Sequence, residues 1–166
     1  MKFPTHLAPL LLFCLSARAA TIPAASGTAL DGHSITLPRD LAPHATVLIL
    51  GFTQHSQAPT TAWEVAIRNH GGLAYLDMPV LEDAPGFVRP LIVRSIRKQV
   101  PDLLKPRFVP LTSGESAWKQ AAHFSSAAPD AAYVLLVDST GLIRWQTHDA
   151  CTPALLAQLS AAAQSW

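Results

Sequence analysis

The stretch Val47-Leu48-Ile49-Leu50-Gly51-Phe52 is a continuous apolar run with the length of a β-strand. Apolar residues at every position, rather than at alternate ones, are typical of a central strand that is buried on both faces. The polar residues 53–59 follow and predict a loop. Thr61 and Glu64 then have the spacing of a capping box, and the pair Gly71-Gly72 ends the helix that it opens.

The same alternation continues along the chain. We expect an edge strand within 30–38, a strand at 73–78, a helix from Gly86 to Pro101, a short strand at 107–111, a helix capped by Ser113, a hairpin over 133–145 and a last helix starting at Thr152 and Pro153. Strands that alternate with helices indicate an α/β domain, and the hairpin makes its sheet mixed. A three-layer thioredoxin-like domain with a mixed central sheet satisfies this order.

Composition limits what such a domain does. The chain has 166 residues, which fits one domain, and 49% of them are apolar, which is enough for a sizeable core. The formal charge of +1 leaves no excess of basic residues to neutralise phosphates, so the composition excludes an electrostatic nucleic-acid binder. Two cysteines, Cys14 and Cys151, are too few for a disulfide framework or a four-ligand zinc site.

The N-terminus has the pattern of an export signal. Lys2 gives a positive start, residues 7–15 are apolar, and Ala17-Arg18-Ala19 has the small residues of a cleavage site. We therefore expect a signal peptide at 1–19, a leader at 20–29 and the domain at 30–166. The protein would be exported to the bacterial periplasm, where it could associate with the membrane. Removal of the signal would leave Cys151 as the only thiol.

Several segments carry a resemblance to thioredoxin and peroxiredoxin relatives: Asp31-Gly32 to Leu37, Gly51-Phe52-Thr53, and Val137 to Ile143. More specifically, the chain resembles the family of mitochondrial ATP synthase assembly factors and its bacterial counterparts. Gly51-Phe52-Thr53 followed by Trp63, the segment from Pro79 to Pro101 with its arginines, and the hairpin from Leu136 to Trp145 carry this second resemblance. It implies an assembly factor or chaperone for a membrane complex, with the proton-channel sector of ATP synthase as partner.

The chain departs from redox thioredoxins where their chemistry takes place. Those enzymes carry a Cys-x-x-Cys pair after the central strand, where a helix N-terminus stabilises a thiolate. Residues 53–60 contain no cysteine here, and the position of the thioredoxin cis-proline corresponds to about Ala132. Because dithiol–disulfide exchange needs an attacking thiolate and a resolving thiol, we expect no such activity, no enzyme of this type and no cofactor.

Two alternatives remain open from the residues. Cys151 stands where the last helix begins, next to His148 and Asp149, so a lowered thiol pKa could make it the nucleophile of a one-cysteine peroxidase or reductase. A set made of His55, His148 and Cys151 would suit copper and a copper-delivery role. No paired spacing supports either one, and the sequence predicts no dedicated metal site.

A binding role has more support. Basic residues gather in one predicted helix, and the apolar Phe87 and Leu91 lie near two of them at helical spacing. Such a face suits subunits of a membrane complex, or contact with the membrane surface itself. The residues that this interpretation assigns to binding are Thr53, Gln54, His55, Ser56, Gln57, Trp63, Arg89, Arg94, Arg97 and Lys98.

Overall fold

The computed structural model of the protein describes residues 20–165, with six strands, four α-helices and two short 3-10 helices in that range. In chain order they are β1 (Ala25–Thr28), β2 (Ser34–Leu37), β3 (Ala45–Gly51), η1 (Gln54–Ser56), α1 (Gln57–His70), β4 (Ala74–Pro79), α2 (Arg89–Gln99), η2 (Lys105–Arg107), α3 (Glu115–Ala121), β5 (Ala132–Asp138), β6 (Ile143–Thr147) and α4 (Pro153–Ala163). The predicted signal peptide at 1–19 lies outside the described residues. Among the described helices, none is long and apolar enough to cross a membrane.

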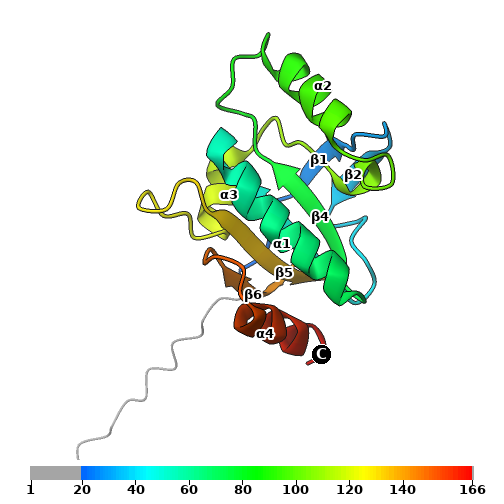
Figure 1. Cartoon of the computed structure of the whole chain (residues 1–166), viewed down its shortest axis with the longest axis vertical. Helices are drawn as coiled ribbons and strands as arrows, with labels where there is room; N and C mark the ends of the chain where they lie inside the picture. The colour runs from blue at the N-terminus through cyan, green and yellow to red at the C-terminus, as the bar shows by residue number, and fades with distance from the viewer. Residues whose placement is uncertain (1–19, 166) are drawn as a thin grey trace, which may run out of the picture.

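The central sheet has the strand order β4-β3-β5-β6 (Figure 1). β3 pairs in parallel with β4, and the α1 crossover joins these two strands, whereas β3–β5 and β5–β6 are antiparallel. Every residue of β3 and β5 is buried, as expected for strands that are covered on both faces. The sheet is therefore mixed, as the sequence predicts.

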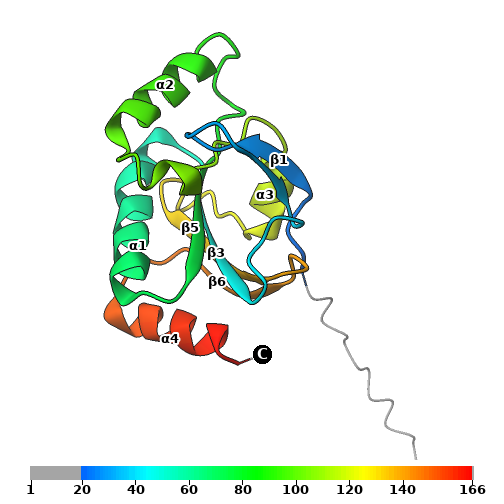
Figure 2. The same cartoon turned by 90° about the vertical axis from the view of Figure 1, so that its right-hand side faces the viewer.

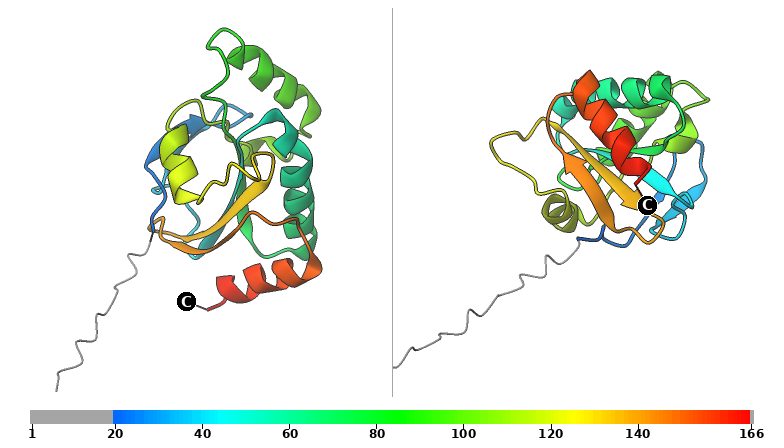
Figure 3. Two further views of the ribbon diagram at one scale, coloured as in Figure 1. Left: turned by 90° about the vertical axis from the view of Figure 1, so that its left-hand side faces the viewer. Right: turned by 90° about the horizontal axis from the view of Figure 1, so that it is seen from below.

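Two apolar cores lie on opposite faces of this sheet. Helices α1 and α4 cover one face, where Trp63, Ile67 and Leu159 are completely buried. The other face is covered by α3, through Trp118, and by the separate β1–β2 pair, through Ile35 and Leu37. Figures 2 and 3 show the sheet between these two coverings. The predicted three-layer α/β architecture is confirmed.

Two predicted elements at the C-terminal end match the structure closely. In the hairpin, the Asp138 carboxylate accepts hydrogen bonds from the Thr140 hydroxyl at 2.6 Å and from Arg144 Nε at 2.9 Å. Helix α4 begins after Thr152, whose hydroxyl accepts a hydrogen bond from the Leu155 amide at 3.2 Å. Pro153 occupies the first helical position, where a missing N–H costs nothing.

Three other elements differ from the prediction. Helix α1 starts at Gln57, four residues before Thr61, because Thr53 and Ser56 form a capping box over η1 that leads straight into the helix. Helix α2 spans only Arg89–Gln99. Residues 107–111 do not form a strand; isolated bridges join Phe108 to Asp77 of β4, and Leu111 to Val80, the residue after β4.

Helix α3 is capped differently from our expectation. It starts at Glu115, not directly after Ser113, and its N-cap is Gly114 in the left-handed conformation (φ 80°). Glycine adopts this conformation without steric cost. The Glu82 carboxylate, from a distant loop, accepts the hydrogen bond of the Glu115 amide at 2.5 Å. This cap is tertiary, so the local sequence does not reveal it.

Residues 20–29, which we expected to precede the domain as a leader, contribute to it. β1 pairs antiparallel with β2, and Ala29 is completely buried. The Ile22 amide donates to the Gly141 carbonyl at 2.9 Å, which ties the start of the described chain to the β5–β6 turn. Glycine has a low β propensity, yet Gly27 lies in β1. A Cβ atom added at this position would lie 2.7 Å from Val109 Cγ1, which is too close.

Asp138→Ala should destabilise the protein by about 1–2 kcal/mol, because it removes several hydrogen bonds to one buried carboxylate. Despite some desolvation, these bonds lower the pKa of Asp138 from 3.8 to about 2. A depressed pKa gives stability that is present above pH 4 and lost as the pH falls towards 2. Urea unfolding of both proteins at pH 7 and pH 2.5 checks this. An equal difference at both pH values would contradict it.

Candidate functional site

The site begins where β3 leaves the sheet. Gly51 ends the strand under the first turns of α1, where an added Cβ would lie 3.0 Å from Ser56 Cβ. Thr53 is extended (φ −135°, ψ 167°), and its amide donates to the Ser56 hydroxyl at 3.3 Å. The chain therefore turns from strand to helix within a few residues, and the turn is held by its own side chains.

Asp130 joins this turn to the loop that precedes β5. The Thr53 hydroxyl donates to Asp130 Oδ1 at 2.5 Å, although the two residues are 77 positions apart in the sequence. The same oxygen lies 3.8 Å from His55 Nδ1. Both partners are accessible, since the side chains of His55 and Asp130 are 83% and 53% exposed. The result is an exposed polar surface on a fixed backbone.

An aromatic cluster supports this surface from below. Phe52 meets Phe124 and Tyr133 edge-on, with centroids 5.3 and 5.4 Å apart, and His148 stacks on Tyr133 at 5.4 Å. The Tyr133 hydroxyl donates to the Ala128 carbonyl at 2.9 Å. This bond fixes the loop that carries Asp130. The cluster has a structural role: its rings pack together and the Tyr133 hydroxyl is hydrogen-bonded to the backbone.

The structure divides the predicted loop residues into two groups. Gln54, His55 and Gln57 are exposed, and we call these three the loop patch. Ser56 and Trp63 are buried, at 1% and 0% exposure. Trp63 packs edge-on against Trp145, and its indole N–H donates to the Asp149 carbonyl at 3.1 Å. Trp63 and Ser56 are therefore structural residues that position the patch, and neither presents a surface to a partner.

The predicted basic helix stands apart from the three layers. We call residues 87–107, which include α2, the α2 arm; it projects from one end of the molecule (Figures 1 and 2, and Figure 3, left). Arg94, Arg97 and Lys98 are exposed, as expected for a binding face. Ile92, Val93 and Ile96 form the half-buried stripe on the other side of the helix, and no residue of α2 is fully buried.

Arg89 has a different role from the other basic residues. Its guanidinium points back to the base of the arm and donates to three carbonyl oxygens, of Ala84 at 2.8 Å, Thr112 at 3.3 Å and Glu82 at 2.5 Å. These carbonyls belong to the two segments that lead into and out of the arm. Arg89 thus anchors the arm, so its donors are not available to a partner in the way we expected.

Cys151 does not have the surroundings of a nucleophile. The residue is half-buried against the core that Trp145 and Leu155 border, and burial raises the pKa of its thiol. A raised pKa reduces the thiolate fraction at neutral pH, whereas reactive cysteines have lowered values. The lowered pKa that the one-cysteine alternative requires is therefore not found.

No metal centre is assembled in the described part of the chain. Within residues 20–165, no three His, Cys, Asp or Glu side chains lie close enough together to hold a metal ion. His148 stacks on Tyr133, and His55 faces Asp130 on the surface. The set of His55, His148 and Cys151 therefore does not fit a three-ligand copper site in this conformation.

A buried acidic pair lies under α1. Asp77 of β4 and Glu64 of α1 are 4% and 5% exposed. Glu64 accepts hydrogen bonds from Arg68 at 2.8 Å and from the Tyr75 hydroxyl at 3.1 Å. Burial, with a smaller contribution from Glu64, raises the pKa of Asp77 from 3.8 to about 7. Asp77 is thus a core residue.

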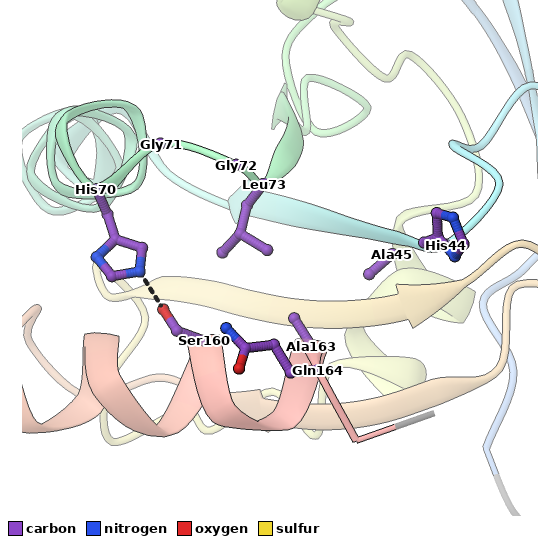
Figure 4. Close-up of a pocket in the computed structure, with 9 residues that line it drawn as sticks. All are labelled: His44, Ala45, His70, Gly71, Gly72, Leu73, Ser160, Ala163 and Gln164. Atoms are coloured by element: carbon purple, nitrogen blue, oxygen red, sulfur yellow. Dashed lines mark hydrogen bonds between the residues drawn. The ribbon is translucent and has the colours of Figure 1, made fainter.

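One hollow lies at the opposite end of the sheet from the loop patch, between the end of α1, the start of β3 and α4. Figure 4 shows His70 and Ser160 directed towards each other, with Nε2 and Oγ 2.9 Å apart. Leu73, Ala163 and Gln164 complete much of the wall. Its volume of about 180 Å³ is below the range of about 300–1,000 Å³ that is usual for small-molecule sites.

Comparison with known proteins identifies the fold. The chain is similar to BsSco, of the Sco family of cytochrome c oxidase assembly proteins (12% identity, 90% of this chain and 96% of that chain, TM-score 0.59). It is similar to the exposed lipoprotein thioredoxin Etrx1 of Streptococcus pneumoniae (12%, 84% and 99%, TM-score 0.56), and to Arabidopsis thaliana ScoI with copper bound (14%, 89% and 100%, TM-score 0.56). No family model and no curated protein matches the chain. The fold is therefore thioredoxin-like.

Sequence reasoning missed Asp130 as a site residue. Its only local signal is the pair Pro129-Asp130, which is typical of a turn, and its contact with Thr53 depends on the tertiary fold. The predicted site residues also fall into two regions. The loop patch lies at the end of β3, whereas Arg94, Arg97 and Lys98 lie on the projecting arm.

Asp77→Asn should stabilise the protein at pH 8 by about 2 kcal/mol, because an amide carries no charge to desolvate. The raised pKa means that wild-type stability falls as the pH rises from about 4 to about 7, and is constant above that. Urea unfolding from pH 3 to 8 should show convergence of the two proteins at pH 3. A constant difference across this range would show that Asp77 does not titrate with folding.

Arg89→Ala should loosen the base of the α2 arm, because three carbonyl oxygens lose a charged donor. We expect faster amide hydrogen exchange within residues 82–112 and little change in the central sheet. Arg94→Ala is the matched control, since Arg94 is exposed on the same helix. Equal exchange in the two variants would contradict an anchoring role for Arg89.

Proposed function

We propose that the protein is an exported, redox-inactive thioredoxin-like protein that binds subunits of a membrane complex during assembly. The observation that carries the proposal is the loop patch. At the position where thioredoxins carry their thiols, this chain presents Gln54, His55 and Gln57 on a backbone that Thr53 and Asp130 hold in place. A pre-ordered polar surface suits protein recognition, because little conformational entropy is lost on binding.

The absence of thiol chemistry supports binding over catalysis. The sequence contains two cysteines, and Cys14 falls in the predicted signal peptide. Cys151 has a raised pKa and has no second thiol to resolve a mixed disulfide after export. The one-cysteine peroxidase or reductase therefore remains the weaker alternative. Loss of a peroxide-consuming activity in Cys151→Ser would establish it.

The likeness to Sco proteins favours cytochrome c oxidase as the type of complex. BsSco belongs to a family of cytochrome c oxidase assembly proteins, and the alignment covers nearly all of both chains. The sequence resemblance instead names the proton-channel sector of ATP synthase as the partner. Both are multi-subunit membrane complexes, so the general proposal applies to either one. Identification of the subunits that bind the protein would decide between them.

Copper delivery is the second candidate, favoured by the likeness to ScoI with copper bound. Copper would be the cargo, and imidazole and thiolate groups are suitable ligands for it. The described residues do not bring three such groups together, so delivery would require ligands from the partner or a rearrangement near His148 and Cys151. Tight Cu(I) binding that is lost in His148→Ala and Cys151→Ser would raise this candidate above the first.

Site-specific crosslinking in cells tests the main proposal. A photo-crosslinking residue at Gln57, in the loop patch, should capture membrane subunits that mass spectrometry can identify. The control is Gln158, an exposed glutamine on α4, on a different surface of the molecule. Subunits captured from Gln57 and absent from Gln158 support the proposal, and oxidase or ATP synthase peptides would name the complex. Identical capture from both positions would contradict a specific loop patch.

A further inference from the structure

The charges of the protein are separated between the α2 arm and the body. Residues 87–107 contain six basic side chains and one acidic side chain. The rest of the described range contains four basic and ten acidic side chains. The formal charge is therefore +5 on the arm and −6 on the remainder. A negative surface would attract the arm and repel the body, and so orient the whole molecule.

The exposed basic residues of α2 are not used inside the protein. Within residues 20–165, Arg94, Arg97 and Lys98 pair with no carboxylate. By contrast, Arg89 binds backbone carbonyls, and Arg107 lies 4.5 Å from the centre of the Tyr75 ring. Three cations held on one exposed helix, each without a counter-ion, point to an anionic ligand outside the chain.

Large apolar side chains accompany these cations. The three large hydrophobic residues that are most exposed in the described range, Phe87 (81%), Leu91 (64%) and Leu103 (87%), all lie on the α2 arm. Leu91 is followed by Arg94 and Lys98 at helical spacings of three and four residues, so these side chains share one face. Ile92 and Ile96, which are half-buried, lie on the other face of the helix.

We propose that the α2 arm docks the protein on the surface of an anionic phospholipid bilayer. Phe87, Leu91 and Leu103 would enter the boundary between headgroups and acyl chains, and Arg94, Arg97 and Lys98 would bind lipid phosphates. Helices that lie in the membrane interface bind through buried apolar area together with electrostatic attraction to anionic lipids. An acidic protein surface would also attract the cations; the lipid surface is favoured because it combines anionic phosphates with a continuous apolar layer beneath them.

Docking through the arm would place the rest of the molecule in a defined orientation. The described chain starts at the opposite end from α2, beside the β5–β6 turn, where Ile22 binds Gly141 (Figure 1). The arm therefore provides a membrane contact that is independent of the N-terminal segment. The acidic body would be held away from the lipid.

Vesicle co-sedimentation tests the proposal. The protein starts at Ala20, so that the apolar residues of the predicted signal are absent, and it keeps every described strand and helix. We expect binding to vesicles of equal parts phosphatidylglycerol and phosphatidylcholine, weak binding to pure phosphatidylcholine, and loss of binding at high salt. Arg94→Gln should lower the partition coefficient about fivefold, as expected for one charge at the surface. Arg39→Gln is the matched control, because Arg39 is exposed on the body and not on the arm.

Apolar insertion has its own measurement. Leu103→Ser should weaken binding several-fold without changing the salt dependence, because it removes apolar burial and leaves every charge in place. Equal effects of Arg94→Gln and Arg39→Gln, or equal binding to both kinds of vesicle, would overturn the proposal. The proposal would also be overturned if the protein did not bind either kind of vesicle and Arg94→Gln abolished subunit capture in cells, because the arm would then bind protein and not lipid. Because vesicles contain no subunit, failure here leaves the loop-patch proposal untouched.

Discussion

Complete burial of β3 is the constraint on which the rest of the fold depends. All seven residues of the strand are buried, so both edges must be paired and both faces must be covered. β4 and β5 pair with the edges, and the two apolar cores cover the faces. The first backbone that can reach solvent again is the turn after Gly51. A surface at this turn is thus supported by the most rigid part of the molecule.

The turn after Gly51 is ordered although it contains no cysteine. Hydrogen bonds of Thr53 with Ser56 and with Asp130 hold the turn and join the end of β3 to the loop before β5. Phe52 and Tyr133 fix the two strands beneath that junction through an edge-on contact. A thioredoxin-like scaffold without a redox pair therefore keeps a well-defined surface at this turn. Under the proposed function, the side chains of the loop patch would decide what this surface binds.

The elements that could be predicted from sequence are those with local signals. The apolar run of β3, the turn after Asp138 and the cap at Thr152 each lie within a few residues, and each prediction was confirmed. The predicted start of α1 was wrong, because the capping box that forms is the one at Thr53 and Ser56, ahead of Thr61. β1 was missed because its sequence gains a partner only in the folded chain.

The site was less predictable than the fold, for the same physical reason. The contact between Thr53 and Asp130 joins residues that are distant in the chain, and no periodicity encodes it. The structure gives two of the predicted binding residues other roles. Trp63 belongs to the core, and Arg89 binds backbone carbonyls at the base of the arm. Sequence patterns indicated which residue types were present, whereas topology decided which of them reach the surface.

The way the chain enters and leaves the α2 arm has a consequence for evolution. The Leu81 amide donates to the Leu111 carbonyl at 2.7 Å, so the excursion between them returns to the point where it left β4. Lengthening or shortening such an excursion costs little, because loop-closure entropy grows only slowly with length and both ends stay bonded in place. The arm is in this sense a removable module. Proteins with this layered body could therefore differ in the length and residues of the arm, and so in the surface that the arm contacts, while the body stays unchanged.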